Sequence, residues 1–230
     1  MSINNSVFTN ASAFTALRSL NKINERLDTT QGRVSTGLKV ASSLDDASAF
    51  AVAQGIRAEV RALDSVIQGL NNSKAVGKVA VAGATAVSNL MIDIRQKLTE
   101  LANSSISTAQ RTIIQRDFTE LVSQAANFVS NATYNGFALL TSDANNVDTL
   151  SNLGGSQLTL TAQANVKVLI NSLAAGTTAT AANAQSVIVG QFTALESAVA
   201  QALGTIGAEV RALDLQTGFL EELRDTTTIG

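Results

Sequence analysis

Apolar residues that alternate four and three positions apart are the feature that most constrains the fold of this chain. This heptad spacing is typical of a coiled-coil seam, in which a narrow stripe on one helix packs against a partner helix. It runs through Ile56, Val60, Leu63, Ile67 and Leu70, through Ala86, Leu90, Ile94, Leu98 and Leu101, and through Ile114, Phe118, Leu121, Ala125, Phe128 and Ala132. The pattern predicts long helices that need partner helices for burial.

A returning helix is expected over residues 187–224. Apolar residues recur there at helical spacing: Phe192, Leu195, Val199, Leu203, Ile206, Val210, Leu213 and Leu220. The chain has no Pro, which agrees with uninterrupted helices, because Pro in a helix interior costs roughly 3 kcal/mol. The segment AEVRALD occurs at residues 58–64 and again at 208–214. Because the similarity stops within a few residues, we favour convergence of two antiparallel coiled-coil helices over domain duplication.

The N-terminal region carries a narrower apolar stripe over residues 10–33. Its members are Phe14, Leu17, Leu20, Ile23 and Leu27. The stripe is too narrow for a self-sufficient core helix. No comparably amphipathic segment follows the returning helix, so we expect this stripe to lack a partner within the chain.

The stretch RVSTGLKVASSLDDASAFAV, residues 33–52, interrupts the helical pattern. Thr36-Gly37, Ser42-Ser43 and Asp45-Asp46 supply bends and capping groups. Ser43 or Asp45 is predicted to cap the following helix, a contribution of about 0.5–2 kcal/mol. The alternative, a catalytic carboxylate pair at Asp45 and Asp46, is disfavoured because no nucleophile or ligand cluster accompanies it.

The residue pattern changes between the two regions predicted to be helical. YNGFALLTSD, residues 134–143, contains the strong turn signal Asn135-Gly136. Leu158 and Leu160 alternate with polar residues, and NVKVLIN follows, so we expect a small β element with one or two hairpins. GTTATAANAQS, residues 176–186, reads as a low-complexity connector at the outer tip. The region 134–186 is therefore predicted to be a small β insertion.

Composition excludes most chemistry. The chain has no Cys and no His, which removes disulfides, thiolate chemistry and the commonest general base and metal ligand. We expect no enzyme activity and no cofactor or metal. The net charge is −2 without a basic block, which disfavours nucleic-acid or anionic-membrane partners. No window is judged to approach the roughly 18 apolar residues of a membrane span, and the N-terminus lacks signal-peptide features. These rules alone describe a soluble, unsecreted protein.

The sequence resembles bacterial flagellin. The resemblance is carried by LRSLNKINERLDTTQGRVSTGLKVASSLDDASAFAVAQGIRAEVRAL, residues 17–63, by LTELANSS at 98–105 and by YNGFALL at 134–140. It implies a mainly α fold: a long antiparallel coiled-coil bundle, or rod, with a small β-hairpin region. The implied parts are an inner-domain helix at 1–33, a spoke linker at 34–46, rod helices at 47–133, a variable outer region at 134–186, a returning rod helix at 187–224 and a C-terminal linker from 225 to 230.

The resemblance also implies function and location. Flagellins are structural subunits that polymerise into the flagellar filament for motility. They are exported through the flagellar type III apparatus without a cleavable signal peptide, which reverses the unsecreted reading. The implied partners are other flagellin copies, an export chaperone, and the hook-junction and cap proteins, at an extracellular location.

Two sets of residues are expected to hold this assembly together. The rod-core seam comprises Ile56, Val60, Leu63, Ile67, Leu70, Phe118, Leu121, Phe128, Leu203, Val210 and Leu213. The terminal-helix contact between subunits comprises Phe14, Leu17, Leu20, Ile23 and Leu27. Flagellins end with a further helix that pairs with the N-terminal one, and this sequence ends at Gly230 before such a helix. Two alternatives follow: a truncated form, which we expect not to polymerise, or a natural tail that lies outside this sequence.

A receptor-facing segment is also implied. MIDIRQKLTELANSS, residues 91–105, stands where many flagellins are recognised by the flagellin-sensing Toll-like receptor. Arg95 matches a basic position of that motif, whereas Asp93 replaces an Arg and Lys97 replaces a Leu. We expect weak or no recognition, because charge reversal replaces attraction with repulsion. For the isolated chain, Asp93, Arg95 and Lys97 are read as an ordinary solvated helix face.

Two other functions are weighed. A hook–filament junction protein shares the terminal helices but occupies only a few positions. A flagellin-homologous surface-binding protein would need a sugar platform, and TTATAANAQS and GGSQLTL contain no aromatic residue, with aromatics only 4% of the chain. The filament subunit is the favoured interpretation.

Overall fold

The fold is mainly α, as the sequence predicts, in a computed structural model that describes residues 11–229. The chain divides into two compact units, Met1–Glu59 and Val60–Gly230. The first unit contains α1 (Ala11–Thr36) and the start of α2 (Ala47–Leu101), joined by a bent segment. Helix α1 includes the first three residues of the predicted linker 34–46 and ends before Gly37, whose φ of 68° suits a residue without a Cβ. Residues 1–10 of the predicted terminal helix lie outside the described residues.

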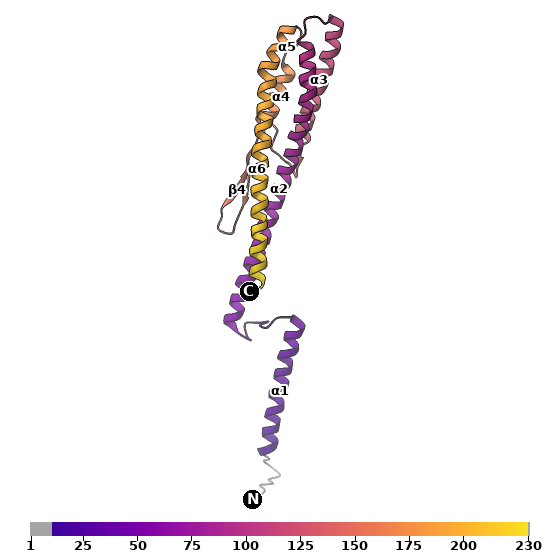
Figure 1. The fold of residues 1–230 in the computed structure, drawn as a ribbon. Helices are drawn as coiled ribbons and strands as arrows, with labels where there is room; N and C mark the ends of the chain where they lie inside the picture. Colours follow the sequence, from indigo (N-terminus) through magenta and orange to yellow (C-terminus); the bar gives the residue numbers. More distant parts are fainter. Residues whose placement is uncertain (1–10, 230) are drawn as a thin grey trace. The chain divides into compact units, whose positions relative to one another are not determined.

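The second unit is a bundle of long helices. It contains the rest of α2, α3 (Thr108–Asn131) and α6 (Thr193–Ile229), which run alongside one another in Figure 1. A capping box starts α3: the Ser107 hydroxyl accepts from the Gln110 backbone N–H at 3.3 Å, and the Gln110 side chain accepts from the Ser107 N–H at 3.0 Å. The turn before α3 therefore satisfies its own backbone, and α3 returns antiparallel to α2.

Two antiparallel hairpins follow α3. Strands β1 (Thr133–Tyr134) and β2 (Phe137–Ala138) enclose Asn135-Gly136, whose φ angles of 49° and 81° are those of a type I′ turn. Strands β3 (Val147–Leu150) and β4 (Gln157–Leu160) pair with Val147 opposite Leu160 and Leu150 opposite Gln157. The predicted β insertion is therefore present, but its strands end at Leu160.

The remainder of the predicted β insertion is helical, so that part of the prediction was wrong. NVKVLIN begins α4 (Asn165–Ala175), which buries Val166, Ile170 and Leu173 on one face. Within GTTATAANAQS, the Thr180 hydroxyl accepts from the Asn183 N–H at 3.2 Å and starts α5 (Ala181–Val187). A π-helical turn, η1 (Ile188–Phe192), then leads into α6. Spacing of three and four residues outweighed the β-branched composition.

Two further expectations also need correction. Helix α6 continues to Ile229, so the predicted linker from residue 225 is helical over the described residues. Within residues 11–229, two helical stretches, Ala47–Leu101 and Ala181–Thr228, contain an 18-residue window apolar enough to cross a membrane by length and composition. The expectation that no window approaches this threshold was therefore wrong. Core helices meet the same criterion, and both stretches contribute buried side chains to the bundle.

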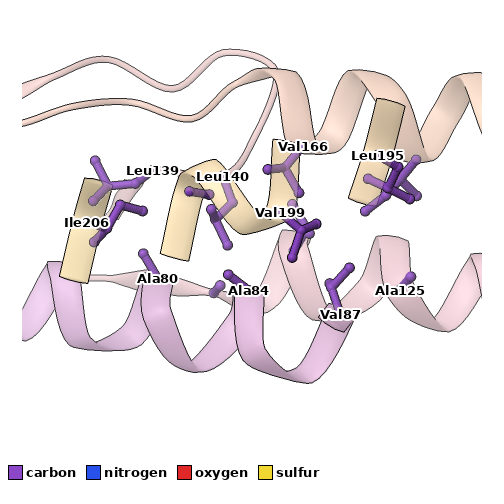
Figure 2. Packing of buried hydrophobic residues seen from close by; sticks show 14 of the residues in the cluster. Ala80, Ala84, Val87, Ala125, Leu139, Leu140, Val166, Leu195, Val199 and Ile206 are labelled. Atoms are coloured by element: carbon purple, nitrogen blue, oxygen red, sulfur yellow. The ribbon is translucent and has the colours of Figure 1, made fainter. Parts of the chain in front are cut away.

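The core depends on small residues where helices meet. Figure 2 shows Ala80, Ala84 and Val87 pointing from α2 into the cluster of buried side chains, with Leu140 and Val199 opposite. All five are at most 2% exposed. Small side chains on α2 leave room for the larger ones from α6 and from the segment after β2.

At two glycines of α2, neighbouring segments pack even closer to the helix backbone. A Cβ built on Gly77 would overlap the Val210 side chain of α6, and one on Gly83 would lie 2.6 Å from the Ala132 Cβ. Neither site has space for a methyl group, so the α2 backbone itself packs against its neighbours.

Gly77→Ala is expected to destabilise the bundle by about 1–3 kcal/mol, because the added methyl group forces α6 away from α2. Urea denaturation followed by circular dichroism measures the change. Gly55→Ala is the matched control, because Gly55 lies in the same helix with nothing within 4 Å of its Cβ position. Equal effects of the two substitutions would contradict the close-approach argument.

Candidate assembly surfaces

Helix α1 presents its apolar stripe to solvent. The five stripe residues are between 52% and 60% exposed: Phe14, Leu17, Leu20, Ile23 and Leu27. The helix has no buried residue. An isolated helix gains stability mainly from packing of its apolar face, and the described part of the first unit supplies no such packing. This stripe is therefore a surface that lacks a partner in the described chain.

The segment between α1 and α2 is organised by two aspartates. The Asp45 carboxylate accepts from the backbone N–H groups of Ala41 and Ser42 at 3.2 and 3.1 Å. The Asp46 carboxylate accepts from those of Ser48 and Ala49, both at 3.0 Å, and is thus the N-cap of α2. The prediction of Ser43 or Asp45 as the cap was wrong: Asp45 closes the preceding turn instead. Both carboxylates are used for backbone hydrogen bonds.

The predicted rod-core residues fall into three groups. Leu63, Ile67, Leu70, Phe118 and Leu213 are buried in the cluster of the second unit, and Leu121, Phe128, Leu203 and Val210 are partly buried against it. Ile56 belongs to the first unit and Val60 is the first residue of the second; both are half-buried and outside the cluster. The central part of the heptad pattern thus lies in the core, and its beginning lies at the edge.

Sequence reasoning missed the contacts that fix the β3–β4 hairpin. The Glu209 carboxylate of α6 accepts from the Thr161 backbone N–H at 2.9 Å and from the Thr161 hydroxyl at 2.6 Å. The Gln216 amide donates to the Ser151 carbonyl at 2.6 Å, and the buried hydroxyls of Ser73 and Thr149 bond to each other. Partners 48 to 76 residues apart leave no local signal in the sequence. They fasten the hairpin to α6 and α2.

The candidate receptor-facing residues lie on two sides of α2. Arg95 lines a groove of about 850 Å³ between α2 and α6. Its guanidinium pairs with Glu196 at 3.2 Å and lies 5.7 Å from the Phe192 ring centroid. Asp93 and Lys97 instead line a groove between α2 and α3, where Lys97 pairs with Glu100 at 3.2 Å. The three residues therefore do not form one patch.

The described residues contain no group of three or more Asp or Glu placed to hold a metal ion. Ionic contacts are instead pairs between helices. The Lys74 ammonium of α2 lies 2.9 Å from the Asp214 carboxylate of α6 and lowers the pKa of that carboxyl. The ionic contacts described above thus hold helices of the bundle together.

The known proteins that this chain resembles are flagellar proteins. Residues 7–145 match the family model of the bacterial flagellin N-terminal helical region. Flagellin FljK of Caulobacter vibrioides is 30% identical over 226 residues, which are 98% of this chain and 82% of that protein. At 17% identity, Bacillus cereus flagellin gives a TM-score of 0.60 over 66% of this chain and 88% of its own. A putative flagellar hook-associated protein from Vibrio parahaemolyticus gives 0.67, also at 17% identity, over 81% of this chain and 97% of its own.

Fold and sequence together define a helical flagellar protein. The chain belongs to the bacterial flagellin family. It is a structural subunit of the flagellar filament, an extracellular homopolymer, as the resemblance implies.

Thr161→Val is expected to lower the free energy of unfolding by about 1–2 kcal/mol, because it removes a donor to the half-buried Glu209 carboxylate. Chemical denaturation measures the loss. Thr159→Val is the matched control: the Thr159 hydroxyl of β4 donates to the exposed Asp148 carboxylate of β3 at 2.6 Å. A loss at Thr161 no larger than that at Thr159 would show that Glu209 does not fasten the hairpin.

Proposed function

We propose that this chain polymerises by burying the α1 stripe between copies, while the second unit serves as the rod. The observation that carries this proposal is a 26-residue helix with five large apolar residues more than half exposed and no buried residue. Burial of these side chains is worth about 25 cal/mol per Å² of apolar surface. A second copy offers the same stripe, so the surface is self-complementary in chemistry.

Leu20→Glu is expected to raise the critical concentration for filament formation by more than about tenfold, because burying an unpaired carboxylate in an apolar contact costs several kcal/mol. Electron microscopy and sedimentation of polymer measure it. Thr29→Glu is the matched control, since it adds the same charge to α1 away from the stripe. Circular dichroism of both variants should give an unchanged thermal transition for the second unit.

Two outcomes would contradict this mechanism. Filaments of Leu20→Glu at wild-type yield would show that the stripe is not buried between copies. Failure of the unaltered chain to form filaments under any condition would show that its stripe is insufficient for assembly.

We propose further partners on the basis of the family resemblance. The chain travels through the flagellar type III export apparatus with an export chaperone and without a cleaved signal peptide. It then meets hook-junction and cap proteins at the ends of the filament. The long, apolar-striped α1 supports a need for a chaperone before assembly, because such a face promotes association.

The flagellin-sensing Toll-like receptor is expected to recognise this chain weakly. Asp93 is exposed on α2, and Lys97 is held by Glu100 and, at 4.0 Å, by Asp117. Arg95 is already engaged by Glu196 and Phe192 on the other side of the helix. A receptor that needs cationic and apolar side chains here therefore finds a carboxylate and two occupied cations.

Asp93→Arg combined with Lys97→Leu is expected to increase receptor activation by at least about tenfold, because attraction and an apolar anchor replace repulsion. A reporter-cell assay on purified protein measures it. Asp143→Asn, which raises the net charge by the same one unit in the loop before β3, is the control. Activation by the unaltered chain at nanomolar concentration would contradict weak recognition.

A hook–filament junction role is the second candidate. The resemblance in fold to the hook-associated protein over 81% of this chain favours it. The two roles differ in the extent of assembly: a filament subunit forms long polymers from its own copies, whereas a junction protein forms a limited ring. Electron microscopy of the unaltered chain distinguishes them.

A further inference from the structure

The outward face of α6 carries a second heptad seam. The inward face buries Val199, Ile206, Leu213 and Leu220. On the opposite side, residues spaced alternately four and three apart form what we term the outer seam: Gly204, Ala208, Arg211, Leu215, Gly218, Glu222 and Asp225. Leu215 is 77% exposed, and Phe219 beside it is 58% exposed. Apolar side chains on two opposite faces are typical of a helix that packs against other elements on both of those faces.

The glycines of the outer seam have no explanation within the described chain. A Cβ at Gly204 or Gly218 would meet nothing within 4 Å. Glycine in a helix interior is destabilising relative to alanine. It is favoured where another surface approaches the backbone closely, as Gly77 shows on α2. A large side chain opposite Gly218 would account for its presence.

Two charged side chains of the outer seam also lack an ion-pair partner within the described residues. Among the described residues, neither the Arg211 guanidinium nor the Glu222 carboxylate has an ion-pair partner, whereas nearby Arg224 pairs with Asp64 at 3.3 Å and Asp225 at 2.8 Å. Arg211 and Glu222 lie at equal distances in sequence from the midpoint between Gln216 and Thr217. So do Leu215 and Gly218.

We propose that two copies of this chain pair through their outer seams, with the two α6 helices antiparallel about that midpoint. Arg211 of each copy then faces Glu222 of the other, and Leu215 of each fills the space over Gly218 of the other. On one flank, Phe219 covers Ala212 of the second copy. A parallel, in-register pairing would instead oppose Arg211 to Arg211 and Glu222 to Glu222, which electrostatic repulsion disfavours.

On the other flank, repulsion between like charges weakens the pairing. It brings Asp214 of one copy near Glu221 of the other. Asp214 is already paired with Lys74 at 2.9 Å, which reduces the repulsion between Asp214 and Glu221. The seam has few large apolar residues, and the expected product is a reversible dimer of modest affinity.

An antiparallel pair is distinct from the filament contact. Its two-fold interface is isologous and closes on itself, whereas an open filament needs heterologous contacts between copies that point the same way. The pair therefore belongs to unassembled chains, and it must open before α6 of each copy enters the filament. If the antiparallel pair does not form, the proposed role of α1 in the filament is unaffected.

Sedimentation analysis of charge variants tests the pairing, with Leu20→Glu present in every chain so that polymerisation through α1 does not interfere. In that background Arg211→Glu or Glu222→Arg alone is expected to raise the dimer Kd at least about tenfold, and the two together to return it within about threefold of the Leu20→Glu chain. Arg116→Glu, an equal charge reversal at an exposed position of α3, should leave the Kd unchanged. A chain that remains monomeric up to about 1 mM, where even weak pairing would register, overturns the proposal. So does a double variant that fails to recover.

Cross-linking tests the antiparallel direction, because the chain has no cysteine of its own. In the proposed pair, the two Gly218 positions are separated along the helix axis by about 4.5 Å and the two Ala208 positions by about 25 Å, at 1.5 Å per residue. A short bis-maleimide should therefore link Gly218→Cys copies and not Ala208→Cys copies. Equal linking of both variants, or of neither, overturns the proposal.

Discussion

The close approach of α2 to its neighbours is the constraint on which the second unit depends. Gly77 and Gly83 leave no room for a methyl group, and Ala80 and Ala84 on the same helix are at most 1% exposed. Small side chains at these positions allow Val210, Leu160 and Leu140 to pack almost onto the helix backbone. Packing at this density gives many weak contacts per residue. A long, slender bundle with few aromatic residues can thereby hold a continuous core.

The β3–β4 hairpin uses that close approach but is held by polar contacts. Leu160 reaches the α2 backbone at Gly77, and Thr149 contacts the position of a Cβ on Gly69 at 3.6 Å. Glu209 and Gln216, seven residues apart on α6, then accept from Thr161 and donate to Ser151. A two-stranded hairpin is marginal in water by itself. Its position therefore depends on helices that are distant from it in sequence.

Helix behaviour differs between the two units for a physical reason. In the second unit every long helix has partners, and its stripe is buried. In the first unit α1 has a stripe of similar side chains, yet each remains more than half exposed. The proposed assembly uses this contrast: the second unit buries its own helices, whereas burial of the α1 stripe is left to other copies.

The sequence by itself determined the long helices, the Asn135-Gly136 turn, the exposed stripe of α1 and the family, because 4-3 spacing and turn chemistry are local properties. It misassigned NVKVLIN, whose β-branched residues also fit a helix face that buries Val166 and Ile170. It placed the cap at Ser43 or Asp45, because the side chains of Ser43, Asp45 and Asp46 can all cap a helix. Only the position at which α2 begins shows that Asp46 is the cap. Only the tertiary structure decided the hairpin contacts of Glu209, the close approach at Gly77 and the separation of Arg95 from Asp93 across α2. Each depends on which surfaces meet across long sequence separations, and a periodic pattern gives the face of a helix without naming its partner.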